Sequence, residues 1–299
     1  MKALSVKSGV LIALAGYAVY AWGDGFIKSL AGQISVFELG FFNSLFAGFF
    51  LYFLRPGAES WSGFWRTSRP WAVHMRGALG LLAGVCSIYA FTTIPLADVY
   101  ALLFLAPLFV TLMSIIFLKE QVGPWRWAAV IAGFLGVLLV VKPGVRELEL
   151  GHLAATAAAL AAAASLVLMR SLANERQTTV IGVLIAYMLI FNAVAAMLTG
   201  VSMPNWQVLV VLVLTGLCTA GGQRLQLLAI RLAPANLIAP THYSQMIWAV
   251  LIGALFFAEY PDGVALFGLA VIAAAGLLTI VRENIRLGSV RWNPFRTRL

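Results

Sequence analysis

Long apolar segments recur along nearly the whole chain and are separated by short polar gaps. A membrane-spanning helix needs about 20 apolar residues, because a rise of ~1.5 Å per residue must cross about 30 Å of hydrocarbon. Ten segments meet this requirement: 9–29, 34–54, 73–93, 97–118, 125–142, 151–170, 179–199, 206–230, 237–258 and 263–281. Their residues do not alternate with a period of two, which favours helices over a β-barrel. The pattern predicts an all-α integral membrane protein with ten transmembrane helices.

The overall composition supports a membrane location. The chain has 299 residues, of which 62% are hydrophobic and only 10% are charged. A soluble domain of this size would need more charge to cover its surface. The formal net charge of +9 comes from basic residues spread over the short gaps, which argues against a nucleic-acid-binding surface. Cys86 and Cys218 both lie inside apolar segments, where cysteine acts as a small hydrophobic residue, so we expect neither a disulfide nor a metal site.

Basic residues are shared unequally between the two sides of the predicted bundle. With the N-terminus in the cytoplasm, most of the 20 Lys and Arg residues fall on the cytoplasmic side, including Arg55, Arg66, Arg176 and Arg231. Short cytoplasmic loops of membrane proteins carry an excess of Lys and Arg. An even number of spans returns the chain to its starting side. We therefore predict that both termini are cytoplasmic.

The fourth and ninth segments share a pattern of prolines and a closing glutamate. Pro95 and Glu120 bracket one apolar stretch, and Pro234 and Glu259 bracket another at the same spacing. Each bracketed stretch is followed by a further apolar segment. We read the two glutamates as turn residues, and the matched spacing as a sign of duplication.

A second match supports the duplication. The first predicted helix ends in KSLA at 28–31, and the sixth ends in RSLA at 170–173. Five helices per copy is an odd number, so the copies must cross the bilayer in opposite directions. Inverted repeats of this kind are typical of secondary transporters whose site lies at the repeat interface. We predict a first repeat at 1–146, a second, inverted repeat at 147–282 and a basic cytoplasmic tail at 283–299.

Three stretches resemble the drug/metabolite transporter (DMT) superfamily, in its ten-helix EamA-type branch. They are WGDGFIKSL from Trp22, LADVYALLFLAPLFVTLMSIIFLKE from Leu96 and GFLGVLLVVKPG from Gly133. Within this branch the chain looks most similar to YddG-type exporters, which move aromatic and other hydrophobic amino acids out of bacterial cells. Many members have an Arg in the second helix where this chain has Asn43, so a binding scheme based on that Arg is not transferred.

The resemblance implies a protein of the bacterial inner (plasma) membrane that works by alternating access around a central cavity. It implies a small-molecule substrate and no cofactor. The leading hypothesis is export of aromatic or hydrophobic amino acids, and the alternative is a broad exporter of drugs or toxic cations. The chain has no G-x-S-x-G motif, no phosphate-binding loop and no paired metal-ligand histidines, so we expect no enzymatic activity. The driving force and the oligomeric state stay open, and a monomer is compatible with the sequence.

Charged residues inside the spans are the first site candidates, because a charge at the bilayer centre costs about 2.5–3.5 kcal/mol on insertion scales. Asp24 and Lys28 are four residues apart, which allows a helical ion pair, or Asp24 attracts a substrate ammonium group. Arg224 either extends to the cytoplasmic surface or binds a carboxylate. The presence of His242 within a span has two explanations. Its ring forms a hydrogen bond with a neighbouring residue, or it binds a substrate carboxylate or takes part in proton coupling.

Aromatic and amide residues complete the predicted cavity. Each aromatic residue by itself is explained by packing, but together they suit an indole or phenyl ring. The cavity candidates are Trp22, Asp24, Tyr89, Tyr100, Phe104, Gln223, Arg224, His242, Tyr243, Gln245 and Trp248. Prolines free backbone carbonyls and permit kinks, so four of them are predicted hinges: Pro95, Pro107, Pro234 and Pro240.

Overall fold

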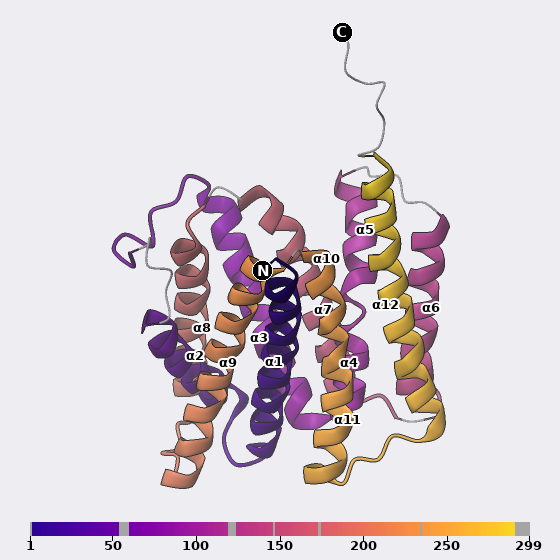
Figure 1. Ribbon diagram of the computed structural model, residues 1–299. Helices are drawn as coiled ribbons and strands as arrows, with labels where there is room; N and C mark the ends of the chain where they lie inside the picture. The colour runs from indigo at the N-terminus through magenta and orange to yellow at the C-terminus, as the bar shows by residue number, and fades with distance from the viewer. Residues whose placement is uncertain are drawn as a thin grey trace.

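The structure is a computed structural model that describes residues 2–53, 60–118, 124–145, 147–172, 175–233 and 235–290. Every regular element in these ranges is a helix, and the helices form one bundle (Figure 1). Seven helices of the described chain are long and apolar enough to cross a membrane, and three shorter apolar helices accompany them. They correspond to the ten predicted segments. The predicted all-α membrane fold is confirmed.

The first half of the chain contains α1 (Lys2–Ser29), α2 (Val36–Phe53), α3 (Pro70–Thr93), α4 (Leu96–Leu103), α5 (Ala106–Leu118) and α6 (Pro124–Val141). The second half contains α7 (Leu150–Met169), η1 (Arg170–Leu172), α8 (Gln177–Thr199), α9 (Trp206–Leu232), α10 (Ala235–Ile238), η2 (Ala239–Tyr243), α11 (Ser244–Phe257) and α12 (Gly263–Val290). The start of α1 and the end of α12 lie toward the same end of the bundle (Figure 1).

The fourth and ninth predicted spans are both discontinuous. Phe104 and Leu105 separate α4 from α5, and Pro107 lies in the first turn of α5. A proline ring clashes with the carbonyl four residues earlier, here that of Leu103, so the helix ends there. In the ninth span the short 3₁₀ helix η2 separates α10 from α11.

The breaks fall beside the predicted hinge residues. Pro95 is the residue before α4, and Pro240 lies inside η2. Pro234 lies outside the described residues. Because the break between α4 and α5 changes the helical phase, Tyr100, Phe104 and Thr111 do not share one face of a continuous helix.

The helices pack across the two halves of the chain. α1 runs along α9, α3 runs along α7, and α6 packs on α12. Figure 1 shows α1 and α9 side by side at the front. Glycines permit close approach of α1 and α9: a Cβ added at Gly9 would lie 2.6 Å from the Cβ of Ala233, and one at Gly222 would lie 2.7 Å from the Tyr20 ring.

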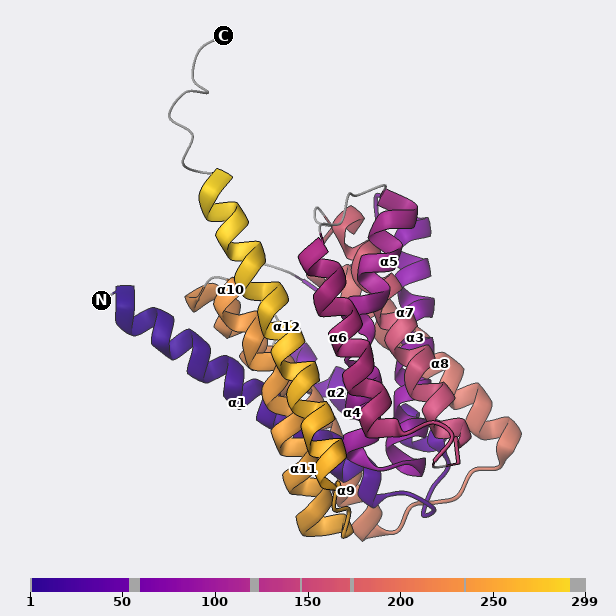
Figure 2. The same cartoon turned by 90° about the vertical axis from the view of Figure 1, so that its right-hand side faces the viewer.

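The short helix α4 lies at the centre of the bundle. Every residue from Leu96 to Leu102 is buried, and α4 contacts α3, α6, α7 and α11. The largest hydrophobic core cluster includes most of α4 together with residues of α1, α6 and α11. Figure 2 shows α1, α11 and α12 leaning away from α3, α5 and α7 toward the end at which α1 begins. At the opposite end, where α4 begins, the ribbons of these helices lie closer together (Figure 2).

Candidate functional site

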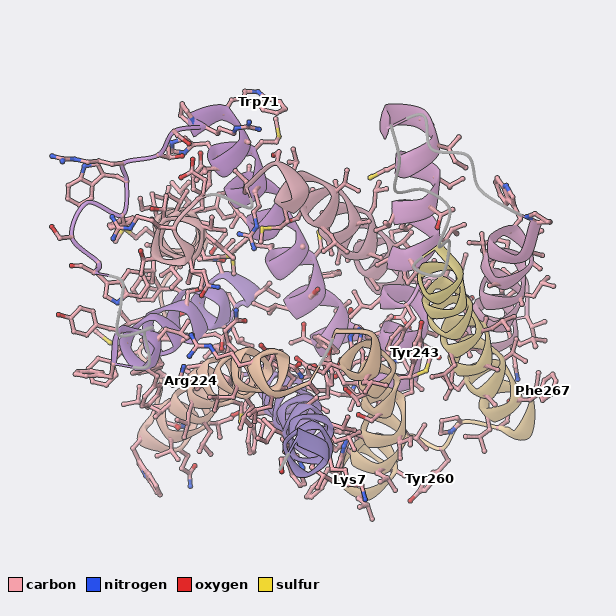
Figure 3. The ribbon with its side chains drawn as sticks, turned by 45° about the horizontal axis from the view of Figure 1, so that its top comes forward. Lys7, Trp71, Arg224, Tyr243, Tyr260 and Phe267 are labelled. Atoms are coloured by element: carbon pink, nitrogen blue, oxygen red, sulfur yellow. The ribbon has the colours of Figure 1, made fainter. Side chains whose placement is uncertain are left out.

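The two helix breaks meet inside the bundle. Phe104 at the end of α4 stacks on Tyr243 at the end of η2, with ring centroids 4.9 Å apart and planes 20° apart. Phe104 also lies 4.9 Å from the ring of His242. Figure 3 shows Tyr243 within the bundle, whereas Phe267 and Trp71 lie at its periphery. Discontinuous spanning helices that meet in this way form the substrate sites of many secondary transporters.

A third helix completes this group. Tyr17 of α1 stacks on His242 with ring centroids 4.8 Å apart. We call Tyr17, Phe104, His242 and Tyr243 the aromatic cluster. His242 is its exposed member, whereas Tyr17, Phe104 and Tyr243 are half-buried. Gln245, three residues after His242, is buried on α11.

Polar side chains continue from the aromatic cluster along α1. The hydroxyl of Tyr20 donates to the side-chain oxygen of Gln223 on α9, at 3.1 Å. One helical turn further on, Asp24 accepts a hydrogen bond from the hydroxyl of Tyr100. Tyr100 is only 3% exposed, so its hydroxyl has little access to water. Asp24 is therefore held at a fixed position between α1 and α4.

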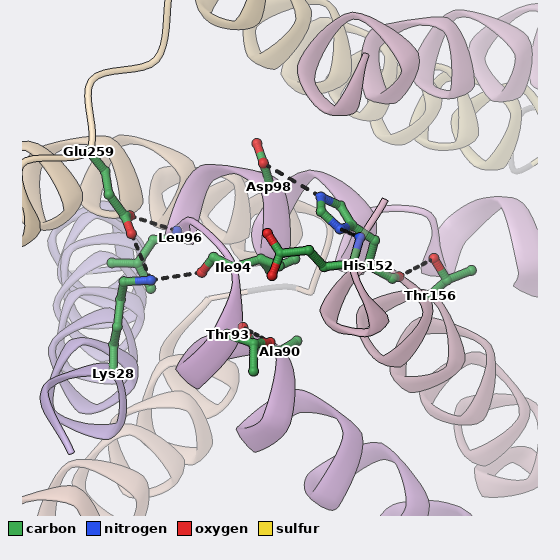
Figure 4. Close-up of polar contacts among 10 residues, drawn as sticks. Lys28, Ala90, Thr93, Ile94, Leu96, Asp98, His152, Thr156 and Glu259 are labelled. Atoms are coloured by element: carbon green, nitrogen blue, oxygen red, sulfur yellow. Dashed lines mark hydrogen bonds and ion pairs between the residues drawn. The ribbon is translucent and has the colours of Figure 1, made fainter. Parts of the chain in front are cut away.

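Of the two alternatives for Asp24, the helical ion pair with Lys28 is wrong, because Lys28 pairs with Glu259. Lys28 Nζ lies 2.7 Å from Glu259 Oε1 and donates to the carbonyl oxygen of Ile94, also at 2.7 Å. The second carboxylate oxygen of Glu259 accepts the backbone N–H of Leu96 at 2.9 Å (Figure 4). Lys28 turns to this site because Glu259 and the Ile94 carbonyl together offer it two acceptors.

Several predicted site residues lie away from the aromatic cluster. Trp22 is 37% exposed and contacts the rings of Phe26 and Phe256 on the outer side of α1. Trp248 is half-buried and packs on the main hydrophobic core. Tyr89 on α3 and Arg224 on α9 are half-buried, and the described ring pairs of the cluster do not include them.

The acidic residue Glu38 is held in a capping box at the start of α2. Its carboxylate accepts the backbone N–H of Ser35 at 2.9 Å, and its own N–H donates to the Ser35 hydroxyl at 3.1 Å. The other carboxylate oxygen accepts the N–H of Ser202 at 2.7 Å and its hydroxyl at 3.0 Å. These four hydrogen bonds give Glu38 a structural role.

The sequence interpretation missed a buried pair between α4 and α7. Asp98 Oδ2 lies 3.8 Å from His152 Nε2, and the two residues are 4% and 7% exposed. Both belong to the class of costly intramembrane groups, so the burial cost itself was the available signal. Asp98 was overlooked because it lies among apolar residues in the first turn of α4.

Cavities border the aromatic cluster on two sides. One of about 490 Å³ lies between α1, α11 and α12, where Leu14, Thr241 and Tyr243 contribute to an apolar lining. A smaller one of about 40 Å³ lies beyond the stacked rings and reaches Gly276 of α12. The larger volume falls in the range of small-molecule sites. Within the described residues, no group of three or more His, Cys, Asp or Glu side chains is placed to hold a metal ion.

A bundle of ten apolar segments, with two discontinuous helices meeting beside the half-buried carboxylate of Asp24, defines a multi-pass membrane transporter. The sequence family agrees with this class. The chain belongs to the EamA-like transporter family, whose model matches residues 7–142. This places it in the DMT superfamily, as the sequence resemblance implied.

Known relatives differ in substrate and in direction of transport. A riboflavin transporter of Rhizobium johnstonii is 32% identical over 222 residues, covering 74% of this chain and 73% of the relative. The pseudopaline exporter CntI of Pseudomonas aeruginosa is 27% identical over 279 residues, covering 90% and 95%. An S-adenosylmethionine uptake transporter of Rickettsia felis is 25% identical over 272 residues, covering 87% and 88%. Transport of small molecules is common to all three.

A solved crystal structure shares the fold. It superposes with a TM-score of 0.66 at 19% sequence identity, covering 94% of this chain and 99% of its own. At this level of identity the match concerns the arrangement of the helices alone.

Proposed function

We propose that this protein is a secondary transporter that exports a small amphipathic solute with a planar ring, by alternating access. Aromatic amino acids are the first candidates. The observation that carries the proposal is the stack of Phe104 on Tyr243, which joins the two helix breaks beside the Asp24–Tyr100 hydrogen bond. Interrupted helices, an aromatic surface and a fixed carboxylate lie within one region of the bundle.

Each part of an aromatic amino acid has a chemical match in this region. The rings of Phe104, His242 and Tyr243 offer surfaces for stacking an indole or phenyl group, an arrangement worth about 0.5–1.5 kcal/mol beyond burial. Asp24 supplies the negative charge that an ammonium group needs. His242 and Gln245 supply polar groups for a carboxylate, and the His242 side chain is exposed enough to be reached.

A flavin is the second candidate. Among the relatives described above, the riboflavin transporter has the highest identity to this chain, and its substrate also has a planar ring. Riboflavin has no ammonium group, so its binding would not require the charge of Asp24. A broad exporter of cationic drugs, the alternative raised from the sequence, would depend on Asp24 and the aromatic rings but not on carboxylate contacts.

We also propose that the two halves, 1–146 and 147–282, are inverted repeats in the bacterial inner membrane, with cytoplasmic termini and a cytoplasmic tail at 283–299. Reciprocal packing supports this, since α1 packs on α9 as α3 packs on α7. The first helix of each half thereby contacts the third helix of the other. In this orientation the end of the bundle where α4 begins faces outward.

The topology is tested by labelling single cysteines from outside intact cells with an impermeant thiol reagent. Cys86 and Cys218 are first replaced by alanine. Gln33→Cys, exposed at the end where α4 begins, should be labelled, and Ser62→Cys, exposed at the opposite end, should not. The reverse labelling pattern would refute the proposed orientation.

The transport function is tested in proteoliposomes loaded with radiolabelled tryptophan, and in a parallel set with riboflavin. Efflux above protein-free liposomes for tryptophan supports the leading proposal, and efflux for riboflavin alone selects the second candidate. If neither substrate, nor phenylalanine, tyrosine or a cationic dye, crosses faster than in protein-free liposomes, the proposed substrate class is wrong.

A further inference from the structure

Two helix ends meet one ion pair at the end of the bundle where α4 begins. The carbonyl of Ile94, at the end of α3, accepts a hydrogen bond from Lys28 Nζ at 2.7 Å. The N–H of Leu96, the first residue of α4, donates to Glu259, which also lies 2.7 Å from Lys28 Nζ (Figure 4). We call these four groups the Lys28–Glu259 network. Terminal carbonyls and N–H groups lack partners within their own helices, so the network satisfies groups that a bilayer would leave unpaired.

The charges of the network suit the helix ends that they contact. The C-terminal end of α3 carries a partial negative charge that attracts Lys28, and the N-terminal end of α4 carries a partial positive charge that attracts Glu259. The two side chains are 11% and 20% exposed, so salt and water screen their attraction only weakly. Lys28 Nζ also lies 5.5 Å from the ring centroid of Phe257, within cation–π distance. The network is therefore a strong connection between the helices that it joins.

The network joins elements that separate from each other toward the other end of the bundle. Lys28 belongs to α1, and Glu259 belongs to the turn between α11 and α12. Figure 2 shows α1, α11 and α12 leaning away from α3 toward the end at which α1 begins. Ile94 and Leu96 lie where α3 ends and α4 begins. For α1 and α11 to separate from α3 at this end as well, the network must break.

Water is able to reach the charges of the network when it breaks. Glu259 lines a cavity of about 130 Å³ together with Pro95 and Tyr260. This volume holds several water molecules, each of which occupies about 30 Å³ in the liquid. Figure 3 shows Tyr260 at the outer edge of the bundle. Separating a buried ion pair is costly when its charges stay without partners, and water in this cavity lowers that cost. The pair is thus suited to open and close.

A second connection lies one helical turn away. Asp24 and Lys28 are four residues apart on α1, and Leu96 and Tyr100 are four residues apart on α4. The hydroxyl of Tyr100 donates to Asp24. α1 is therefore linked to α4 at two successive turns, about 6 Å apart, directly at Asp24 and through Glu259 at Lys28. Neighbouring interactions within one network are energetically coupled, so loss of one connection weakens the other.

We propose that the Lys28–Glu259 network is the outer gate of the transporter and that substrate binding at Asp24 opens it. The inference rests on the proposed function for its substrate and on the proposed orientation for its outer side. A substrate ammonium group competes with the hydroxyl of Tyr100 for the Asp24 carboxylate and releases the first connection. The network alone then holds α1 to α4 and breaks more often. The gate opens after the substrate has bound, which is the order that export requires.

The gate is tested first without substrate, so this test does not depend on the proposed function. His242→Cys, at an exposed position of the aromatic cluster, is introduced into the background without native cysteines. An impermeant thiol reagent is added to one face of the membrane at a time, in intact cells and in inside-out vesicles. Glu259→Gln removes one charge of the ion pair and should raise labelling about ten-fold from the face that labels Gln33→Cys. An unchanged rate from that face would overturn the gate.

Asp262→Asn is the matched control, because Asp262 lies three residues after Glu259 in the same turn and pairs with Lys142 at the end of α6. α6 and α12 pack along each other, so a change in this pair does not release α1 from α3. The variant keeps an acceptor for the N–H of Ala265. Labelling should stay at the rate of the unmodified turn. An increase as large as that of Glu259→Gln would mean that any change in this turn opens the bundle, and would refute the network as the gate.

A second variant covers the case in which Glu259→Gln does not fold. Lys28→Met removes the other charge of the pair and keeps an apolar side chain of similar length. It should raise labelling from the same face, and no increase would overturn the gate. Where both variants fold, the double variant should be labelled no faster than the faster single variant, since both changes break one pair. Increases that multiply would show that Lys28 and Glu259 act separately, against the proposal.

Control of the gate by substrate is measured by hydrogen exchange at the amide of Leu96, in the protein with its native site. Tryptophan should speed this exchange, because the acceptor Glu259 is released more often. Tyr100→Phe frees Asp24 without any substrate and should speed it as well, by about ten-fold. The amide of Ser202, bound to Glu38 at the same end of the bundle, is the reference and should keep its rate.

The two arms of this experiment separate the inference from the proposed function. An unchanged rate at Leu96 in Tyr100→Phe would refute the connection between the site and the gate for any substrate. Faster exchange in Tyr100→Phe without an effect of tryptophan would support that connection and show that tryptophan is not the substrate. Equal acceleration at Leu96 and Ser202 would indicate general loosening of this end of the bundle and overturn the gate.

Discussion

Phe104 and Tyr243 stack with their ring centroids 4.9 Å apart, and they occupy equivalent places in two stretches of the chain. Each follows the proline at the start of its stretch, Pro95 or Pro234, by the same number of residues. If the halves are inverted repeats, the axis relating them passes between these two rings. The preceding residues are then equivalent too, and they differ: Leu103 in one stretch and His242 in the other. Phe104 and Tyr243, which are alike, form the aromatic stack of the site. Leu103 and His242, which differ, make one side of the site apolar and the other polar.

Replacing His242 tests whether the aromatic cluster binds the substrate. His242→Ala removes a ring that stacks on Tyr17 and contacts Phe104. Loss of a ring contact worth about 0.5–1.5 kcal/mol should raise the substrate concentration for half-maximal transport by about two- to ten-fold. The measurement is initial efflux from proteoliposomes over a range of tryptophan concentrations.

A control for His242→Ala comes from the outer side of α1. Trp22→Phe changes a larger ring that contacts Phe26 and Phe256, and it should leave the half-maximal concentration unchanged. His242→Phe keeps a ring and should recover part of the affinity, more for riboflavin than for a substrate with a carboxylate. An unchanged value in His242→Ala would return His242 to a packing role.

The Tyr100–Asp24 hydrogen bond allows charge recognition to be separated from folding. Asp24→Asn keeps the shape of the side chain and an oxygen acceptor for Tyr100 but removes the charge. Transport of zwitterionic tryptophan or of a cationic dye should therefore fall much more than transport of an uncharged ring compound. A hydrogen bond to a charged group contributes about 1.5–3 kcal/mol, so a loss of ten-fold or more is expected for charged substrates.

The comparison among substrates also distinguishes lost charge recognition from a general loss of folding. Tyr100→Phe removes the hydrogen bond and keeps the carboxylate, so it should preserve the preference for positively charged substrates while lowering thermal stability. Equal losses for charged and uncharged substrates in Asp24→Asn would mean that Asp24 stabilises the fold and does not recognise charge.

The ten spans could be predicted from sequence because the bilayer fixes their length and hydrophobicity. The breaks at α4–α5 and at η2 were also within reach, since Pro107 and Pro240 lie inside apolar runs. The partner of Lys28 could not be predicted from the sequence, because Glu259 is distant in the chain. The packing of α1 against α11 brings the two residues together. Asp24 looked like the natural partner from helical spacing alone.

The rotation of each helix is the information that an apolar sequence does not contain. Most faces of these helices are apolar, so the pattern does not say which face turns inward. Trp22 and Asp24 are close in sequence, yet Trp22 lies on the outer side and Asp24 contacts α4. The same uncertainty concealed the Asp98–His152 pair, whose members lie on helices that meet only in the folded bundle.

Glu175 gives a pH-dependent contact outside the membrane-spanning segments. Its carboxylate accepts the backbone N–H groups of Ser68 at 2.9 Å and Arg69 at 3.0 Å, together with the Ser68 hydroxyl. These hydrogen bonds, that of the Ser68 hydroxyl above all, lower the pKa of Glu175. The stabilisation is therefore present above the unfolded pKa of about 4.3 and is lost as the pH falls through the lower, folded pKa.

Hydrogen exchange measures this loss directly. In the protein as isolated, the Ser68 and Arg69 amides should exchange slowly near neutral pH, and Glu175→Gln should make them exchange faster there. At a pH below the folded pKa the protein and the variant should show the same protection. A difference that persists at acidic pH would contradict the assignment of the carboxylate as the acceptor.

Gly276 of α12 provides a test of the Phe104–Tyr243 stack that leaves both rings in place. A Cβ added at Gly276 would lie 1.6 Å from the hydroxyl oxygen of Tyr243 and 1.8 Å from Cζ, so Gly276→Ala must displace the ring. Overpacking of this kind costs about 1–3 kcal/mol in stability. We expect the variant to fold with a lower melting temperature and to lose most of its transport, measured as tryptophan efflux.

Gly133 of α6 is the matched control, because a Cβ there would have its nearest neighbour, the Cβ of Ala275, at an ordinary 3.8 Å. Gly133→Ala should therefore keep both stability and transport. Adding Tyr243→Leu to Gly276→Ala removes the steric conflict, so the melting temperature should recover while transport stays low. Recovery of transport in that double variant would mean that the Tyr243 ring is dispensable, and that Phe104 and His242 carry the recognition of the substrate without it.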